Sequence, residues 1–236
     1  MAMTRAKKIL LSMVVVLIAL AGAVVVVPQL LWADRANYSG AVSIKTTHEY
    51  QDPALLAKAW ALPVAARYRS EIDFQHNGSF CGPTSVVNVM HSLGLGGDQG
   101  TVLAGTDIST ILGFLPGGIT LDQLATVAEQ RLGKNGTVLR DLDLAGFREH
   151  LRQVNDPSRR YIINFTRGPL FGTGGGHHSP IAGYLSEEDL VLVLDVNKKY
   201  GPWLTKPDRL YEAMNTVDRA SGKKRGLLLL RQASSN

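Results

Sequence analysis

Residues 177–203 read HHSPIAGYLSEEDLVLVLDVNKKYGPW and contain two apolar runs, SPIAGY and DLVLVLDV, joined by the polar stretch LSEED. Short apolar runs separated by a few turn-forming residues predict two strands of a β-hairpin. In a hairpin, His177 begins one strand and Asp195 ends its neighbour, so both lie at the same end of a sheet. Two interpretations of Asp195 stay open here: a turn former at a strand end, or a carboxylate that fixes the tautomer of a histidine.

The neighbouring histidines His177 and His178 begin the first of these strands. Successive side chains of an extended strand point to opposite faces of the sheet. We therefore expect one of the two to face a functional site and the other to point away from it.

Helix signals lie earlier in the chain and strand signals later. The segment TLDQLATVAEQRLG starts with a capping-box pair, Thr120 and Gln123, and ends at Gly133, and Asp143 is a predicted N-cap for the next helix. The runs RRYIINF and RGLLLLR read as further strands. This order predicts an α+β fold in one main domain.

The N-terminus carries Arg5, Lys7 and Lys8, followed by an uncharged apolar stretch over residues 9–33. A basic flank before an apolar run of this length predicts a membrane-spanning or export segment. An uncleaved signal anchor and a cleaved signal peptide both fit, because AGA at residues 21–23 could serve as a cleavage site. We therefore divide the chain into a segment 1–33 and a catalytic domain 34–236. The domain is expected to be exported, as a periplasmic or membrane-anchored protein outside the cytoplasm, with the membrane as a partner through the N-terminal segment.

The net charge of +5 excludes a nucleic-acid-binding role for the main domain. Three of the positive charges belong to the N-terminal flank, so the remainder has 22 basic and 20 acidic residues, a balance of +2. Nucleic-acid-binding domains carry a concentrated basic surface instead.

Cys81 is the single cysteine, in the segment QHNGSFCGPTSVVNVMHSLGL, residues 75–95. Exported proteins usually pair their cysteines, and one cysteine has no partner within its chain. It is either a small buried hydrophobic residue or a reactive thiolate. Pro83 suits the first turn of a helix, which would place the thiol at the positive end of a helix dipole.

Three blocks carry a family resemblance: QHNGSFCG, the 173–203 stretch that ends in KKYGPW, and LYEAMNTVDRASGKKRGLLLL. Together they resemble the catalytic domain of phytochelatin synthase, a papain-like cysteine transferase that acts on glutathione. The resemblance covers about residues 45–232. It implies a papain-like α+β fold, with a helical N-terminal lobe and an antiparallel β C-terminal lobe.

The resemblance also implies the site residues. Cys81 would be the nucleophile, His177 the general base and acid, Asp195 the orienting carboxylate, and Gln75 an oxyanion-hole donor. Further residues would bind substrate: Asp218 and Arg225 would hold the γ-glutamyl head, with Lys198 and Tyr200 near a second substrate. No resident cofactor or metal site is expected, although cadmium or zinc bound as a glutathione thiolate could stimulate the reaction. The implied partners are glutathione, metal–glutathione thiolates and a second copy of the chain in a homodimer.

Two departures from the family pattern bear on the reaction. His178 stands where the family has an apolar residue in GHFSP, and Lys198 and Lys199 stand near the position at which the family has a substrate-contacting arginine. Lysine does not offer the bidentate fork of arginine. We therefore expect transfer to water to dominate over transfer to a second glutathione. We also expect the protein to lack the cysteine-rich C-terminal domain of the plant enzymes.

Two other classes of protein remain open. A bacteriocin-leader peptidase also has a glutamine shortly before a Cys-Gly nucleophile, but the GHHSPIAGY block fits it poorly. A non-catalytic, membrane-anchored thiol- or metal-binding protein has no use for Gln75, Cys81, His177 and Asp195 together.

Overall fold

The computed structural model describes residues 5, 7–8, 11–18, 38, 40–68, 72–133 and 136–231. The chain divides into two compact units, Met1–Asp34 and Arg35–Asn236. The predicted N-terminal export segment falls mostly outside the described residues. Within this segment, residues 11–18 are helical and their side chains are exposed. Within the part of the chain that the structure describes, no helix combines the length and the apolar character needed to cross a bilayer.

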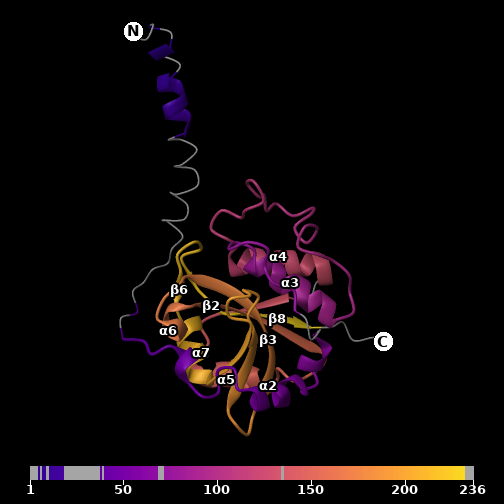
Figure 1. Cartoon of the computed structure of the whole chain (residues 1–236). Coiled ribbons are helices and arrows are strands. Elements are labelled where there is room, and N and C mark those ends of the chain that lie inside the picture. Colours follow the sequence, from indigo (N-terminus) through magenta and orange to yellow (C-terminus); the bar gives the residue numbers. More distant parts are fainter. Residues whose placement is uncertain are drawn as a thin grey trace. The chain divides into compact units, whose positions relative to one another are not determined.

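The first part of the larger unit is helical (Figure 1). Its elements are, in order, η1 (Ile44–Thr46), α2 (Pro53–Trp60), η2 (Ala65–Arg67), α3 (Cys81–Ser92) and α4 (Leu121–Leu132). Helix α4 begins with the predicted capping box of Thr120 and Gln123 and ends at Gly133, whose φ of 90° suits a residue without a side chain. The predicted helix boundaries are therefore confirmed.

The second part contains a six-stranded sheet in the order β1-β8-β2-β3-β4-β5. Its strands are β1 (Gly136–Leu139), β2 (Arg159–Thr166), β3 (Gly176–Leu185), β4 (Leu190–Leu194), β5 (Pro202–Thr205) and β8 (Leu227–Arg231). Every neighbouring pair is antiparallel. The helices between them are α5 (Leu144–Arg152), α6 (Gly168–Phe171) and α7 (Pro207–Met214), and the short strands β6 (Val217–Asp218) and β7 (Lys223–Lys224) form a separate pair.

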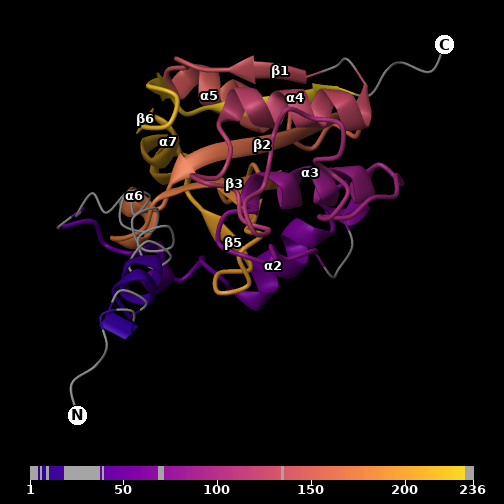
Figure 2. The same ribbon diagram turned by 90° about the horizontal axis from the view of Figure 1, so that it is seen from above.

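Helices cover both faces of the large sheet, as the two views in Figures 1 and 2 show. One apolar cluster joins α3 and α4 to one face, through side chains such as Val86, Leu124 and Leu192. The other cluster joins α5 and α7 to the opposite face, through side chains such as Phe147 and Leu210. Because both faces are covered, strand β4 is buried along its length and reads as a continuous apolar run, LVLVL, rather than as an alternating pattern.

The predicted hairpin is strands β3 and β4, which pair with Ile181 opposite Val193 and Leu185 opposite Leu190. Asp189 in the connection adopts a positive φ of 54°, and its carboxylate pairs with Arg148 and accepts a hydrogen bond from Tyr184. These side-chain contacts offset the backbone strain of a left-handed residue. The helix-then-strand order and the antiparallel sheet confirm the predicted α+β, papain-like fold.

Candidate active site

Cys81 is the first residue of α3, and its side chain is buried at the tip of that helix. The first turn contains Pro83 and no acidic residue, and Phe80 supplies no side-chain cap. The leading N–H groups of a helix have no acceptor within the helix, so they present partial positive charge to whatever lies at its end. The thiol is therefore in a position where a negative sulfur is stabilised.

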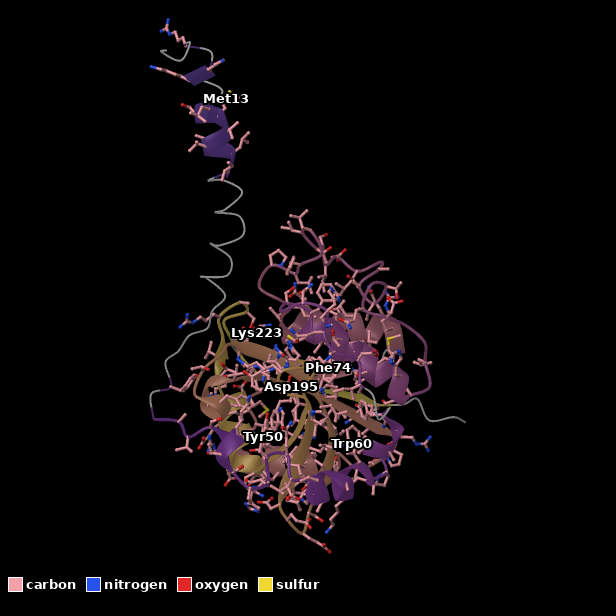
Figure 3. All side chains as sticks on the ribbon, viewed as in Figure 1. Met13, Tyr50, Trp60, Phe74, Asp195 and Lys223 are labelled. Carbon is pink, nitrogen blue, oxygen red and sulfur yellow. The ribbon has the colours of Figure 1, made fainter. Side chains whose placement is uncertain are left out.

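His177 and Asp195 meet at the end of the sheet where β3 begins and β4 has just ended. The His177 Nε2 atom lies 2.9 Å from Oδ1 of Asp195, and both side chains are buried. Figure 3 labels Asp195 near the centre of the larger unit. Since Nε2 is engaged by the carboxylate, Nδ1 is the ring nitrogen left for proton exchange with the thiol. The hairpin thus brings together the two residues as predicted.

Asp195 accepts more hydrogen bonds than the sequence suggested. Two guanidinium nitrogens of Arg167 lie 2.8 and 2.7 Å from its two oxygens, Trp203 Nε1 donates over 3.2 Å, and the Asn197 N–H donates over 2.9 Å. Burial alone would raise the pKa of the Asp195 carboxyl, but His177 and Arg167 together hold it well below its usual range. Asp195 is therefore a carboxylate at all working pH values.

Sequence reasoning missed Arg167, which is buried directly after strand β2. Its guanidinium also lies 3.8 Å from the ring centroid of Tyr200. An arginine directly after the YIINFT stretch of a buried strand was the available signal, because so buried a cation requires an acidic partner. The identity of that partner, 28 residues further along the chain, was not readable from the sequence.

The charges of Cys81 and His177 depend on one another. Burial raises the pKa of the Cys81 thiol, but the charge of His177 and hydrogen bonding to His177 and His178 outweigh this and lower it well below its ordinary value. Burial and Arg167 lower the pKa of His177, whereas Asp195 and Cys81 outweigh them and raise it. These two opposite pKa shifts favour a thiolate–imidazolium pair, the activated form of a cysteine nucleophile.

His178 corrects the prediction that only one histidine of the pair faces the site. Its Nδ1 atom lies 3.9 Å from the Cys81 sulfur, and the residue is as buried as His177. Strand alternation assumes that a site lies over one face of a sheet. Here the tip of α3 meets the first residues of β3, so side chains from both faces reach the thiol.

Gln75 precedes the helix in a loop that the sheet holds in place. Its backbone N–H donates to the Val196 carbonyl over 2.8 Å, one residue beyond Asp195. Its side-chain Nε2 donates to the Asn77 carbonyl over 2.8 Å. An amide nitrogen carries two hydrogens, and this contact uses one of them.

Asp218 and Arg225 come together as an ion pair, with 3.3 Å between Arg225 Nη1 and Asp218 Oδ1. Their segment contains the short antiparallel pair of strands β6 and β7. A side chain on Gly176 would place its Cβ 2.7 Å from Arg225 Nη1, so a glycine there lets the guanidinium lie against the backbone that leads into His177. Arg225 therefore lies beside the residue that precedes His177, and its charge is paired with that of Asp218.

Lys198 and Tyr200 follow Asp195 in a turn, held by a hydrogen bond from the Tyr200 N–H to the Asn197 carbonyl. Lys198 and Lys199 are exposed, whereas Tyr200 is half-buried between Arg167 and Phe171. Tyr200 thus supports the cation that holds Asp195, in addition to any contact with substrate.

These residues define a class of site: a thiolate at a helix tip, an imidazolium on an antiparallel sheet and a buried carboxylate behind it, as in enzymes that use a cysteine for acyl transfer. The phytochelatin synthase family model matches residues 111–227, which include His177, Asp195, Asp218 and Arg225. Over these residues the chain matches the phytochelatin synthase family. Cys81 and Gln75 lie before the matched residues.

Three relatives are named glutathione gamma-glutamylcysteinyltransferase. A Lotus japonicus protein is 47% identical over 73 residues, 30% of this chain and 15% of the relative. A Triticum aestivum protein is 43% identical over 91 residues, which are 38% of this chain and 18% of the relative. A Schizosaccharomyces pombe protein is 28% identical over 169 residues, which cover 66% of this chain and 40% of the relative. The chain thus spans less than half of each of these relatives.

Two solved structures have a similar backbone trace. A C39-like peptidase from Bacillus anthracis matches 71% of this chain and 98% of its own, with 14% identity and a TM-score of 0.49. The peptidase domain of Streptococcus ComA, an ABC transporter involved in quorum sensing, matches 70% of this chain over 100% of its own length, with 15% identity and a TM-score of 0.47.

Proposed function

We propose that this protein is a cysteine-dependent γ-glutamylcysteinyl transferase and hydrolase of glutathione, exported to the outer side of the cytoplasmic membrane. The observation that carries the proposal is the ion pair of Asp218 and Arg225 beside the buried triad of Cys81, His177 and Asp195. The triad supplies acyl transfer, and the pair supplies recognition of an amino-acid head. Glutathione offers both a suitable head and an amide bond within reach of it.

In the first half of the reaction, the Cys81 thiolate attacks the cysteinyl carbonyl of glutathione and forms a carbon–sulfur bond. Gln75 and the leading N–H groups of α3 stabilise the oxyanion. The carbon–nitrogen bond to glycine then breaks, and His177 gives its proton to the departing amine. A γ-glutamylcysteinyl thioester on Cys81 remains.

In the second half, His177 takes a proton from the incoming acceptor, which attacks the thioester carbonyl. The carbon–sulfur bond breaks, the electron pair returns to sulfur, and the thiolate–imidazolium pair is restored. A second glutathione, free or as its cadmium or zinc thiolate, yields a phytochelatin, whereas water yields γ-glutamylcysteine. Lys198 is exposed, and its ammonium group offers a single charge to the carboxylate of a second glutathione, where an arginine would bind it in a bidentate manner. Weaker binding of this acceptor favours hydrolysis by water.

The full chain incubated with glutathione is expected to release glycine and to carry a γ-glutamylcysteinyl mass adduct on Cys81. With added cadmium, γ-glutamylcysteine should outweigh phytochelatin products from the earliest time points, as chromatography over time would measure. Cysteinylglycine, which lacks the γ-glutamyl head, is the matched control and should react poorly. Cleavage of a double-glycine leader peptide without glycine release from glutathione would instead favour the peptidase alternative, and early accumulation of phytochelatins would overturn the preference for water.

The pH profile of glycine release should be a plateau around neutrality. The lowered pKa of Cys81 keeps sulfur ionised as the pH falls below the ordinary thiol range, and the raised pKa of His177 keeps the imidazolium protonated above its ordinary value of about 6.5. Activity is therefore lost on the acid side when sulfur is protonated and on the alkaline side when His177 loses its proton. Asp195→Asn should move the alkaline limb to lower pH, because Asp195 helps to raise the pKa of His177. An alkaline limb that stays in place, in a variant with unchanged circular dichroism, would remove this carboxylate from the mechanism.

A further inference from the structure

His178 is a second imidazole at the nucleophile, and the mechanism above does not use it. It is 3% exposed, lies opposite Asn164 of β2, and places Nδ1 3.9 Å from the Cys81 sulfur. Contacts of catalytic groups are often long in unliganded sites and tighten when substrate binds. The geometry therefore allows an N–H of this ring to point at the sulfur.

The other ring nitrogen indicates which tautomer is present. His178 Nε2 is buried and has no hydrogen-bond partner among the described residues. An imidazolium would carry an N–H on both nitrogens and leave the one at Nε2 buried without an acceptor. Buried N–H groups without acceptors are rarer in proteins than under-satisfied acceptors. The favoured form is therefore the neutral ring with its proton on Nδ1 and a bare lone pair on Nε2.

From this arrangement we propose that His178 is a positioning residue that donates its Nδ1–H to the Cys81 sulfur and stabilises the thiolate. The proposal rests on the proposed function for its kinetic consequence, but not for the contact itself. His178 would act beside His177 and would not exchange protons with substrate. The groups around the sulfur are then His178 and His177 from β3 and the N-terminal dipole of α3, with Asp195 and Arg167 behind His177.

The donor affects both halves of the reaction. A stabilised thiolate is populated at lower pH, and it is also a better leaving group when the thioester breaks. During that step the electron pair of the carbon–sulfur bond returns to sulfur, where it meets the Nδ1–H. His178 would therefore speed breakdown of the thioester by whichever acceptor attacks, and it would contribute to easy hydrolysis in this chain.

Two amide substitutions separate hydrogen bonding from packing. His178→Asn places an amide N–H near the position of Nδ1, whereas His178→Gln places the same group near Nε2, on the side away from the sulfur. His178→Phe removes the donor, and Ser179→Ala is the control for a change at the next buried position of β3. For each full-length variant, two quantities are measured as a function of pH: the rate at which iodoacetamide alkylates Cys81, and the ultraviolet absorbance of the thiolate. Neither measurement requires glutathione.

We expect His178→Gln and His178→Phe each to lower the alkylation rate at mildly acidic pH about fivefold and to shift the thiolate titration to higher pH. His178→Asn and the control Ser179→Ala should stay near the parent rate. With glutathione, kcat should fall for His178→Gln and His178→Phe at unchanged KM. Equal loss in His178→Asn and His178→Gln, or no shift in any variant, would overturn the proposal. If the parent and all variants fail to turn over glutathione but Cys81 still reacts with iodoacetamide as expected, the result would count against the proposed function and not against the contact of His178 with Cys81.

Discussion

Cys81→Ser is expected to lower glycine release from glutathione by at least about a thousandfold, the scale seen when the nucleophile of a triad is removed. A serine hydroxyl is not ionised by a neighbouring imidazole as a thiol is, so the thiolate–imidazolium pair does not form. The measurement is glycine release at substrate saturation, with intact-mass analysis of the protein. The adduct on residue 81 should disappear as well.

The matched control for this variant is Met90→Leu, a volume-conserving change in the same helix. It should retain parental turnover and a similar melting temperature. The serine variant should also melt near the parent, because the side chains are similar in size. Parental turnover in Cys81→Ser would disprove covalent catalysis through this residue.

Arg167→Met is expected to lower the free energy of unfolding by about 3–5 kcal/mol, because it leaves the Asp195 carboxylate buried without its cation. The Arg167 side chain is 7% exposed and the Asp195 side chain is fully buried, so water does not replace the lost partner. Urea denaturation at neutral pH measures the effect. Because Arg167 helps to lower the pKa of Asp195, the loss should shrink as the pH falls and the unpaired carboxyl of the variant takes up a proton.

Arg148→Met is the matched control, since Arg148 also pairs with two aspartates, Asp189 and Asp208, but its side chain is 29% exposed. A partly solvated pair of this kind contributes about 1 kcal/mol or less. If both methionine variants lose the same small amount, burial does not set the strength of the pair around Asp195. Adding Asp195→Asn to Arg167→Met should recover part of the loss, because the second change removes the unpaired charge.

The elements of the fold that depend on neighbouring residues were predictable from the sequence. The β3–β4 hairpin follows from two apolar runs and a short turn, and the start of α4 follows from the Thr120 and Gln123 pair. The meeting of His177 with Asp195 also followed, because a hairpin places the start of one strand beside the end of the next. The order of the strands in the sheet was not predictable. Strand β8 is the last in the sequence, yet it lies between β1 and β2, the first two.

The parts of the candidate site that escaped prediction depend on where separate elements meet. Strand alternation correctly separates His177 from His178 within the sheet, but it contains no information on where the tip of α3 lies. The buried pairing of Arg167 with Asp195 is likewise a contact between two strand ends that are not sequence neighbours. The family resemblance supplied Asp218 and Arg225, whose hairpin has no apolar pattern to announce it.

The hydrogen bond from the Gln75 N–H to the Val196 carbonyl adds the loop before Cys81 to the end of the sheet as one further rung. Any local opening that separates the loop carrying Gln75 from the Asp195 end of the sheet must break this hydrogen bond, and the Gln75 amide hydrogen then becomes free to exchange with solvent. The exchange rate of that single amide therefore reports how often the two halves of the site come apart. Substrate that bridges the loop and the sheet should slow the exchange, without any chemical step being needed to reveal its binding.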